Sequence, residues 1–150
     1  MAMRKHGAFI KRKAKATPGL IAQNIGTAYE TRLRMAVEAF RGGWAKPDHF
    51  NDLADTLDLL QIGIALYPSQ KPDPSTAAAA EVVLVAMQNM LARFDSCGKL
   101  GVTGEELKAI ELLADVSIDY WNRRSGALFA EAYRQLKAVR NAQGQAKEAA

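Results

Sequence analysis

The side chains best suited to nucleophilic or acid–base catalysis are scarce in this chain, which has one cysteine, Cys97, and two histidines, His6 and His49. A cysteine nucleophile needs an imidazole or another activating group beside it. His6 lies in a basic N-terminal segment. Cys97 stands at the end of an apolar helical segment, where we expect a buried and inert thiol. Because the sequence places no activating group beside Cys97, we predict no catalytic residue and no enzyme.

Metal binding is the other chemistry that the residue types offer. His49, Asp52 and Asp55 present ligand atoms on adjacent helical turns, but no second cluster with glutamate-x-x-histidine spacing faces them, as a metal site in a helical bundle would. The series Asp48, Asp52, Asp55 and Asp58 also fits the start of a helix, where the dipole favours carboxylates. We therefore interpret it as a solvated acidic face. No glycine-rich turn matches a phosphate-binding loop, and we predict neither metal nor cofactor.

Charge is distributed unevenly along the 150 residues. The chain has 20 Lys and Arg against 16 Asp and Glu, a net charge of +4. Six of the bases and no acid fall in the first 18 residues, which leaves residues 19–150 with a net charge of −2. We interpret residues 1–17 as a flexible basic arm that binds nucleic-acid phosphates, with a merely solvated terminus as the alternative. The predicted phosphate-binding residues are Arg4, Lys5, Lys11, Arg12, Lys13 and Lys15.

The elements that must carry these residues are helices, because apolar residues recur at three- and four-residue steps between short polar turns. The predicted helices span residues 18 or 27 to 41, 48–66, 75 or 76 to 98, 103–122 and 125–142. The fourth has the clearest start, a capping box made by Thr103 and Glu106. A proline-rich linker covers residues 68–75, and residues 144–150 are expected to be frayed. We predict an all-α five-helix bundle with one domain over 18–143.

The fourth predicted helix is more apolar than a single packing seam requires. It is therefore either the centre of the bundle or part of a surface that a partner covers. Burial within a monomer is the default interpretation, and a bound protein or a homodimer is the sharper alternative. The predicted partner-binding residues are Val82, Val85, Val116, Tyr120, Arg123 and Arg124. The two arginines are more simply interpreted as a pair at a helix C-terminus, where basic side chains complement the dipole.

Cysteine usage and hydropathy indicate where the protein resides. One cysteine cannot form an internal disulfide, which excludes a secreted disulfide scaffold. The most apolar uncharged run, residues 82–92, has 11 residues, whereas a membrane span needs about 20. No targeting segment is visible at the N-terminus. We therefore expect a soluble cytoplasmic protein with no membrane partner.

Three segments carry a resemblance. They are the basic opening, residues 4–13, which leads to Pro18; the apolar helix of residues 57–66; and a C-terminal part in which a glycine-rich turn precedes residues 107–112 and then 124–132. In this order the chain resembles uncharacterised small helical proteins encoded by temperate phages, plasmids and integrated elements of Gram-negative bacteria. The resemblance implies an accessory gene on a mobile element, and some such genes block host defence. The chain lacks the acidic surplus of inhibitors that mimic DNA.

These observations lead to three functional hypotheses. The first is a non-catalytic interaction protein of a mobile element that binds a host protein or nucleoprotein complex with help from the basic arm. An inhibitor of host defence of the anti-CRISPR type is one concrete form of it. The second is a small DNA-binding regulator, which needs a helix with a basic face. The third is a metal-dependent enzyme that uses His49 and the nearby aspartates.

Overall fold

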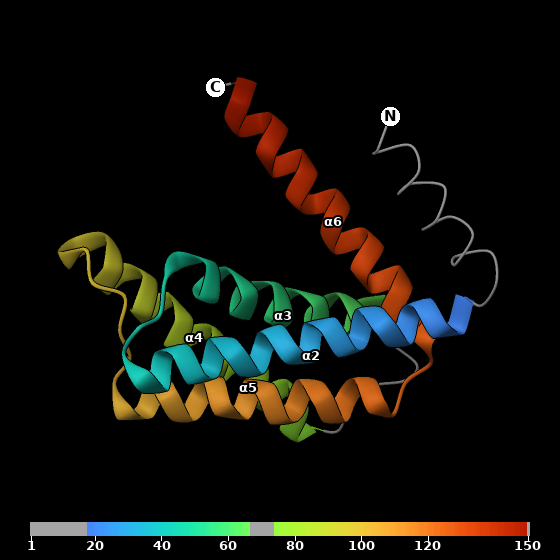
Figure 1. Ribbon diagram of the computed structural model, residues 1–150, viewed down its shortest axis with the longest axis horizontal. Coiled ribbons are helices and arrows are strands. Elements are labelled where there is room, and N and C mark those ends of the chain that lie inside the picture. Colours follow the sequence, from blue (N-terminus) through green and yellow to red (C-terminus); the bar gives the residue numbers. More distant parts are fainter. Residues whose placement is uncertain (1–17, 67–73, 150) are drawn as a thin grey trace.

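The computed structural model describes residues 18–66 and 74–149, with side chains over 28–66 and 74–146. This part of the chain folds into five α-helices and contains no strand (Figure 1). The helices are α2 (Pro18–Gly42), α3 (Pro47–Leu66), α4 (Pro74–Cys97), α5 (Gly104–Asn122) and α6 (Gly126–Ala149). The predicted all-α fold class is therefore confirmed. The basic arm, residues 1–17, and most of the predicted linker lie outside the described residues.

Local chemistry explains where the helices begin and end. Proline is the first residue of α2, α3 and α4, a position at which its missing N–H costs no hydrogen bond. Helix α2 ends in a Schellman motif: Gly43 has φ +78°, and the N–H groups of Gly43 and Trp44 donate to the carbonyls of Phe40 and Ala39. Helix α6 continues to Ala149, past its predicted end at residue 142.

Helix α3 is the centre of the bundle, since it packs against each of the other four helices. Its contacts divide the interior into two clusters. The larger joins α2, α3, α4 and α5 around Phe40, Leu53, Met90 and Ile110. The smaller joins α3 and α6 around Leu59, Phe129, Ala132 and Leu136. The fourth predicted helix, α5, packs against α4, α2 and α3, so it is one wall of the bundle and its apolar surface is largely used inside the monomer.

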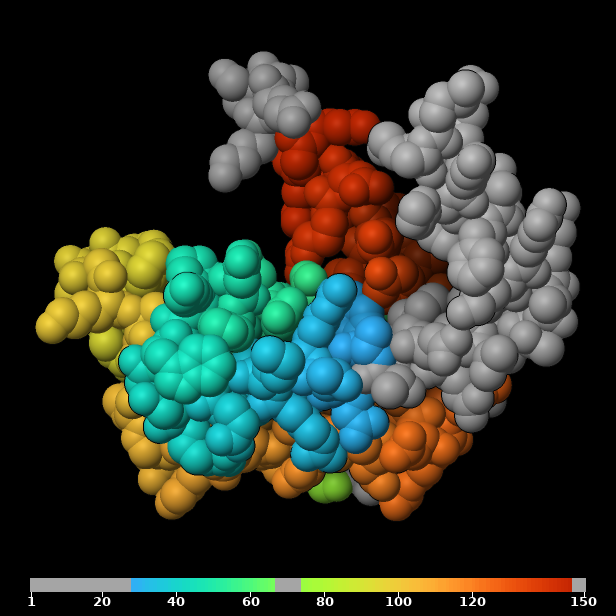
Figure 2. Space-filling model, in the orientation of Figure 1, coloured from blue at the N-terminus to red at the C-terminus, as the bar shows by residue number. Residues whose placement is uncertain are grey.

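Helix α6 is attached to the bundle at two levels. Near its start, the Phe129 ring makes edge-to-face contacts with Trp121 and Tyr29, with ring centroids 4.9 and 5.9 Å apart. Farther along, Arg140 binds Asp55 at 2.8 Å and Asp58 at 2.6 Å on α3. Beyond that bridge, α6 leaves the other helices obliquely, and its C-terminal half projects from the body (Figures 1 and 2).

The crossing of α3 and α5 depends on a missing side chain. Gly63 is buried in α3, and a β-carbon at this position would lie 2.5 Å from Cη2 of Trp121. Two carbon atoms cannot approach this closely. The absence of a side chain therefore makes room for the end of the Trp121 indole at Gly63, where the ring also joins the aromatic contacts with Phe129.

Replacing this glycine tests the packing. Alanine raises intrinsic helix propensity by about 1 kcal/mol, yet Gly63→Ala should lower the free energy of unfolding by about 1–3 kcal/mol, because the indole must move. Gly144→Ala in α6 is the matched control, since nothing lies within 4 Å of its added β-carbon, and it should be neutral or stabilising. Denaturant unfolding followed by tryptophan fluorescence gives both values. Equal effects of the two substitutions would contradict the steric explanation.

Candidate interaction surface

The described residues that could have carried catalysis lie on different helices, Cys97 at the end of α4 and His49 near the start of α3. Cys97 is exposed at the end of α4, so the predicted burial of its thiol is wrong. The last turn of α4 extends past the helices on which α4 packs (Figure 1), which leaves no neighbour to cover it. His6 lies outside the described residues. Within them, no group of three or more His, Cys, Asp or Glu side chains is placed to hold a metal ion.

His49 closes the turn between α2 and α3. Its Nδ1 accepts a hydrogen bond from the Lys46 N–H at 2.9 Å, and its ring meets the Trp44 ring edge-to-face, with centroids 5.2 Å apart. A ring nitrogen that already accepts a backbone hydrogen bond cannot ligate a metal through the same lone pair. The contacts of His49 therefore give it a structural role at the start of α3.

The aspartates of α3 are not simply the solvated face that the sequence predicted. Asp55 and Asp58 form the bridge to Arg140, which is absent from the local pattern because the arginine is about eighty residues away. Burial lowers the pKa of Arg140, and the hydrogen bonds that its guanidinium donates to the two carboxylates outweigh this and raise the pKa. Burial also raises the pKa of Asp52, an effect that Arg32 opposes. Two members of the acidic series, Asp55 and Asp58, thus attach α6 to the bundle.

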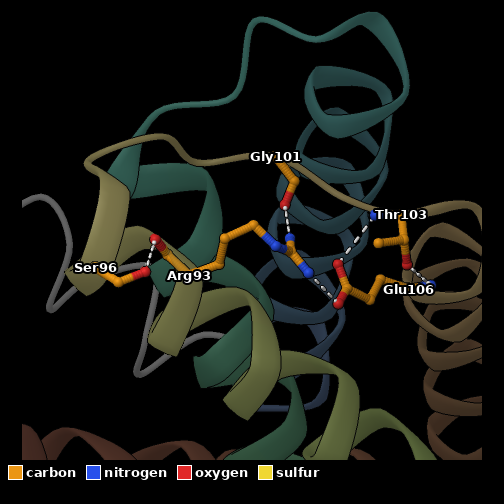
Figure 3. Close-up of polar contacts among 5 residues, drawn as sticks. All are labelled: Arg93, Ser96, Gly101, Thr103 and Glu106. Carbon is orange, nitrogen blue, oxygen red and sulfur yellow. Dashed lines mark hydrogen bonds and ion pairs between the residues drawn. The ribbon is translucent and has the colours of Figure 1, made fainter.

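The most enclosed charged group is Glu106, at the start of α5, with 6% of its surface exposed. Its carboxylate accepts hydrogen bonds from Arg93 of α4 at 2.6 Å and from the Thr103 N–H at 3.0 Å (Figure 3). The Thr103 hydroxyl accepts from the Glu106 N–H, which completes the predicted capping box. Arg93 also donates to the Gly101 carbonyl at 3.1 Å. One carboxylate therefore joins the end of α4, the connecting loop and the first turn of α5.

The acid sensitivity of this junction follows from the pKa of Glu106. Burial raises that pKa, and the hydrogen bonds from Arg93 and Thr103 more than offset the increase, so the pKa lies below its ordinary value. A lowered pKa in the folded state stabilises the fold at pH values above the unfolded pKa, which is about 4.3. This contribution is lost as the pH falls through the lower folded value.

Glu106→Gln should therefore lower the free energy of unfolding at neutral pH and flatten its decline below about pH 4. Glu105→Gln is the control, because the neighbouring Glu105 is exposed and pairs only loosely with Lys108 at 3.7 Å. Thr103→Ala should cost about 1 kcal/mol through loss of the cap. Urea unfolding at several pH values measures all three. An acid limb that Glu106→Gln leaves as steep as before would exclude Glu106 as its source.

The outer side of α4 is the clearest unpartnered surface among the described residues. We call it the α4 stripe; its residues lie at helical spacing and are all exposed: Ala78, Glu81, Val82, Val85, Gln88, Asn89 and Ala92. Val82 and Val85 are each 55% exposed, and Leu84 and Leu91 widen the stripe on one flank. Glu81 is the only charge between residues 74 and 92. That scarcity of charge was the sequence signal for the whole stripe, of which the prediction named two residues.

The other predicted partner-binding residues do not extend this stripe. Tyr120 is 3% exposed, so the prediction that it lies on a partner surface is wrong. Its ring packs against Trp121 and carries the Arg124 guanidinium 4.3 Å from its centroid. Arg123 pairs with Asp119 at 3.1 Å, and Val116 is half-buried. At this end of α5, Tyr120 belongs to the interior of the bundle, whereas Arg123 is exposed and paired within its own helix.

A shallow hollow between α2 and α5 is lined by Arg34, Val37, Glu38, Arg41, Glu111, Ala114 and Asp115. Arg41 lies across it, bound to Glu111 at 2.9 Å and to Glu38 of its own helix. Arg34 pairs with Glu30 at 3.3 Å. Both arginines at the hollow are therefore paired with carboxylates, and the Arg41–Glu111 pair holds α2 against α5.

Helix α4 is the one described helix that is long and apolar enough to cross a membrane, judged by length and composition alone. The core helix of a soluble protein meets the same criterion. Six residues of α4 are buried in the bundle: Ala79, Ala80, Val83, Ala86, Met87 and Met90. Part of the apolar character of α4 thus belongs to the packing of the monomer, and the exposed remainder is the α4 stripe.

Comparisons with protein-family models, with curated proteins and with solved structures found no match. Two features of the chain itself bear on its function: the α4 stripe and the basic sequence that precedes α2.

Proposed function

We propose that this chain is a non-catalytic interaction protein of a mobile element, which binds a host protein or nucleoprotein complex. The observation that carries the proposal is the α4 stripe, an apolar helix face that the monomer leaves uncovered. Exposed apolar patches of this kind are typical of protein-contact surfaces. The polar groups that the sequence offered for chemistry make structural contacts instead, as His49 and Asp55 illustrate.

The basic arm supplies the second half of the proposal. Its support comes from the sequence: six bases without an acid precede a body of net charge −2. Lysine and arginine side chains attract phosphate backbones without reading base sequence. A protein with a protein-contact face and a phosphate-binding arm suits a nucleoprotein target. An inhibitor of host defence of the anti-CRISPR type is the concrete form that the resemblance to mobile-element proteins favours.

Salt titration tests the arm. Six phosphate contacts give a slope of about −5 when the logarithm of the association constant for a random duplex is plotted against the logarithm of salt concentration. Replacing Arg4, Lys5, Lys11, Arg12, Lys13 and Lys15 by glutamine should remove most of this slope and most of the binding. Replacing Arg123 and Arg124 by glutamine is the control. Fluorescence anisotropy with a labelled duplex measures the slope, and the same slope in the arm variant would exclude the arm from binding.

Affinity capture from the native host, with and without nuclease, tests the partner class. We expect a defined protein to be enriched in both samples and to be reduced when the arm bases are replaced by glutamine. A helical protein of similar size and isoelectric point provides the background. Enrichment of no protein above this background would contradict the proposed function, and enrichment that nuclease abolishes would assign the partner to nucleic acid alone.

A further inference from the structure

The α4 stripe can pair with a second copy of itself. Its exposed residues lie at equal distances on either side of Val85: Ala78 and Ala92 seven residues away, Glu81 and Asn89 four, and Val82 and Gln88 three. At 1.5 Å per residue the stripe runs for about 21 Å. The residues at its two ends are small, its centre is apolar, and its single carboxylate stands at the position that mirrors an amide.

We propose that a second copy of this chain covers the α4 stripe, with the two α4 helices antiparallel and a two-fold axis passing beside Val85. The inference rests on the proposed function, because it keeps the α4 stripe as a protein-contact surface. It gives that surface to a second copy, and the resulting dimer then binds the host complex with its two basic arms. A two-fold axis makes an interface isologous, so every patch must fit its own mirror position. Here Val85 meets the partner's Val85, and Ala78 meets the partner's Ala92, where two small residues let the helices approach closely.

The polar residues of the α4 stripe favour the antiparallel arrangement. The carboxylate of Glu81 lies opposite the partner's Gln88 and the partner's Asn89, whose amide groups can donate hydrogen bonds to it. The two copies of Glu81 stand about 12 Å apart along the helix axes. A parallel pairing would place the two carboxylates against each other, which is unfavourable in an apolar contact. The antiparallel helix dipoles also oppose each other favourably.

The flanks of the α4 stripe add apolar contact. Rotation about the axis keeps each flank on its own side, so Leu84, 38% exposed in the monomer, comes next to the partner's Leu84. A standard interface buries about 800 Å² per partner, which is more than one helix stripe provides. We therefore expect a dimer with a dissociation constant in the micromolar range. Each dimer carries two basic arms and twelve arm bases.

Sedimentation analysis tests the dimer over a broad concentration range. The full chain should shift from monomer to dimer, and Val85→Glu should remain a monomer, because the substitution places two carboxylates at the axis. Val139→Glu is the matched control: Val139 is 45% exposed but lies on α6, so this variant should dimerise like the natural chain. Circular dichroism and thermal unfolding verify that both variants fold. A natural chain that stays monomeric, or a Val85→Glu variant that still dimerises, would overturn the proposal.

Cross-linking tests the direction of the helices. Cys97 is the only cysteine, so Cys97→Ser provides a background without thiols. In that background Val85→Cys should form a disulfide-linked dimer under mild oxidation with diamide. Ala78→Cys should not, because its two copies would be about 21 Å apart. Linkage through Ala78→Cys instead would show a parallel pair and overturn the antiparallel arrangement.

Two further measurements separate the dimer from the proposed function. If the natural chain is monomeric and floats with neutral phosphatidylcholine vesicles, and Val85→Glu does not float, a membrane occupies the α4 stripe and the dimer is wrong. If Val85→Glu is monomeric but captures the same host protein as the natural chain, the dimer and the host contact are separate, and both proposals hold. Loss of host capture in the arm variant, with dimerisation unchanged, would support the role of the arm in the proposed function and would leave the dimer unaffected.

Discussion

The buried carboxylate of Glu106 is the interaction on which the outer surface of this molecule depends. It accepts hydrogen bonds from Arg93 and from the Thr103 N–H, the second of which is part of the capping box. These bonds join the last part of α4 to the first turn of α5. That junction sets the rotation of α4 about its own axis. With this rotation, Val83, Met87 and Met90 face the core and the opposite side of the helix faces outward. An unpaired carboxylate at this depth would be costly, so the ion pair strongly restricts alternative packings of the two helices.

Other polar groups that are suited to chemistry also make structural contacts within the chain. His49 uses a ring nitrogen to accept a backbone hydrogen bond at the start of α3, and Asp55 and Asp58 hold α6 through Arg140. Tyr29 lies within the aromatic contacts, where burial raises the pKa of its hydroxyl and the nearby Asp55 raises it further. These groups place their lone pairs and charges on neighbours within the chain. What is left for a partner is apolar surface, which is consistent with an interaction protein.

The proposed surfaces differ in the forces that they use. The α4 stripe has one charge over its length and would gain affinity from apolar contact and close packing. The basic arm has six charges and would gain affinity from release of counterions, which makes it sensitive to salt. Dimerisation through the first would bring two copies of the second together. Binding of both arms to one nucleic acid or nucleoprotein would then be an intramolecular event for the second arm, which raises avidity without a new contact.

The sequence by itself determined the features that depend on near neighbours. The five helices and the capping box of Thr103 and Glu106 follow from residues within one or two turns of each other. The contacts between helices and the burial of individual side chains were decided by the tertiary structure alone, because they depend on which helix lies alongside.

Arg93 reaches Glu106 across a loop, and Arg140 reaches Asp55 from the far end of the chain. Tyr120 is buried because α5 is a wall of the bundle, and Cys97 is exposed because α4 extends past its neighbours. Hydrophobic periodicity tells which residues share a face of a helix. Only the packing of all five helices tells which of two apolar faces is covered, and on α4 that choice left one of them outside.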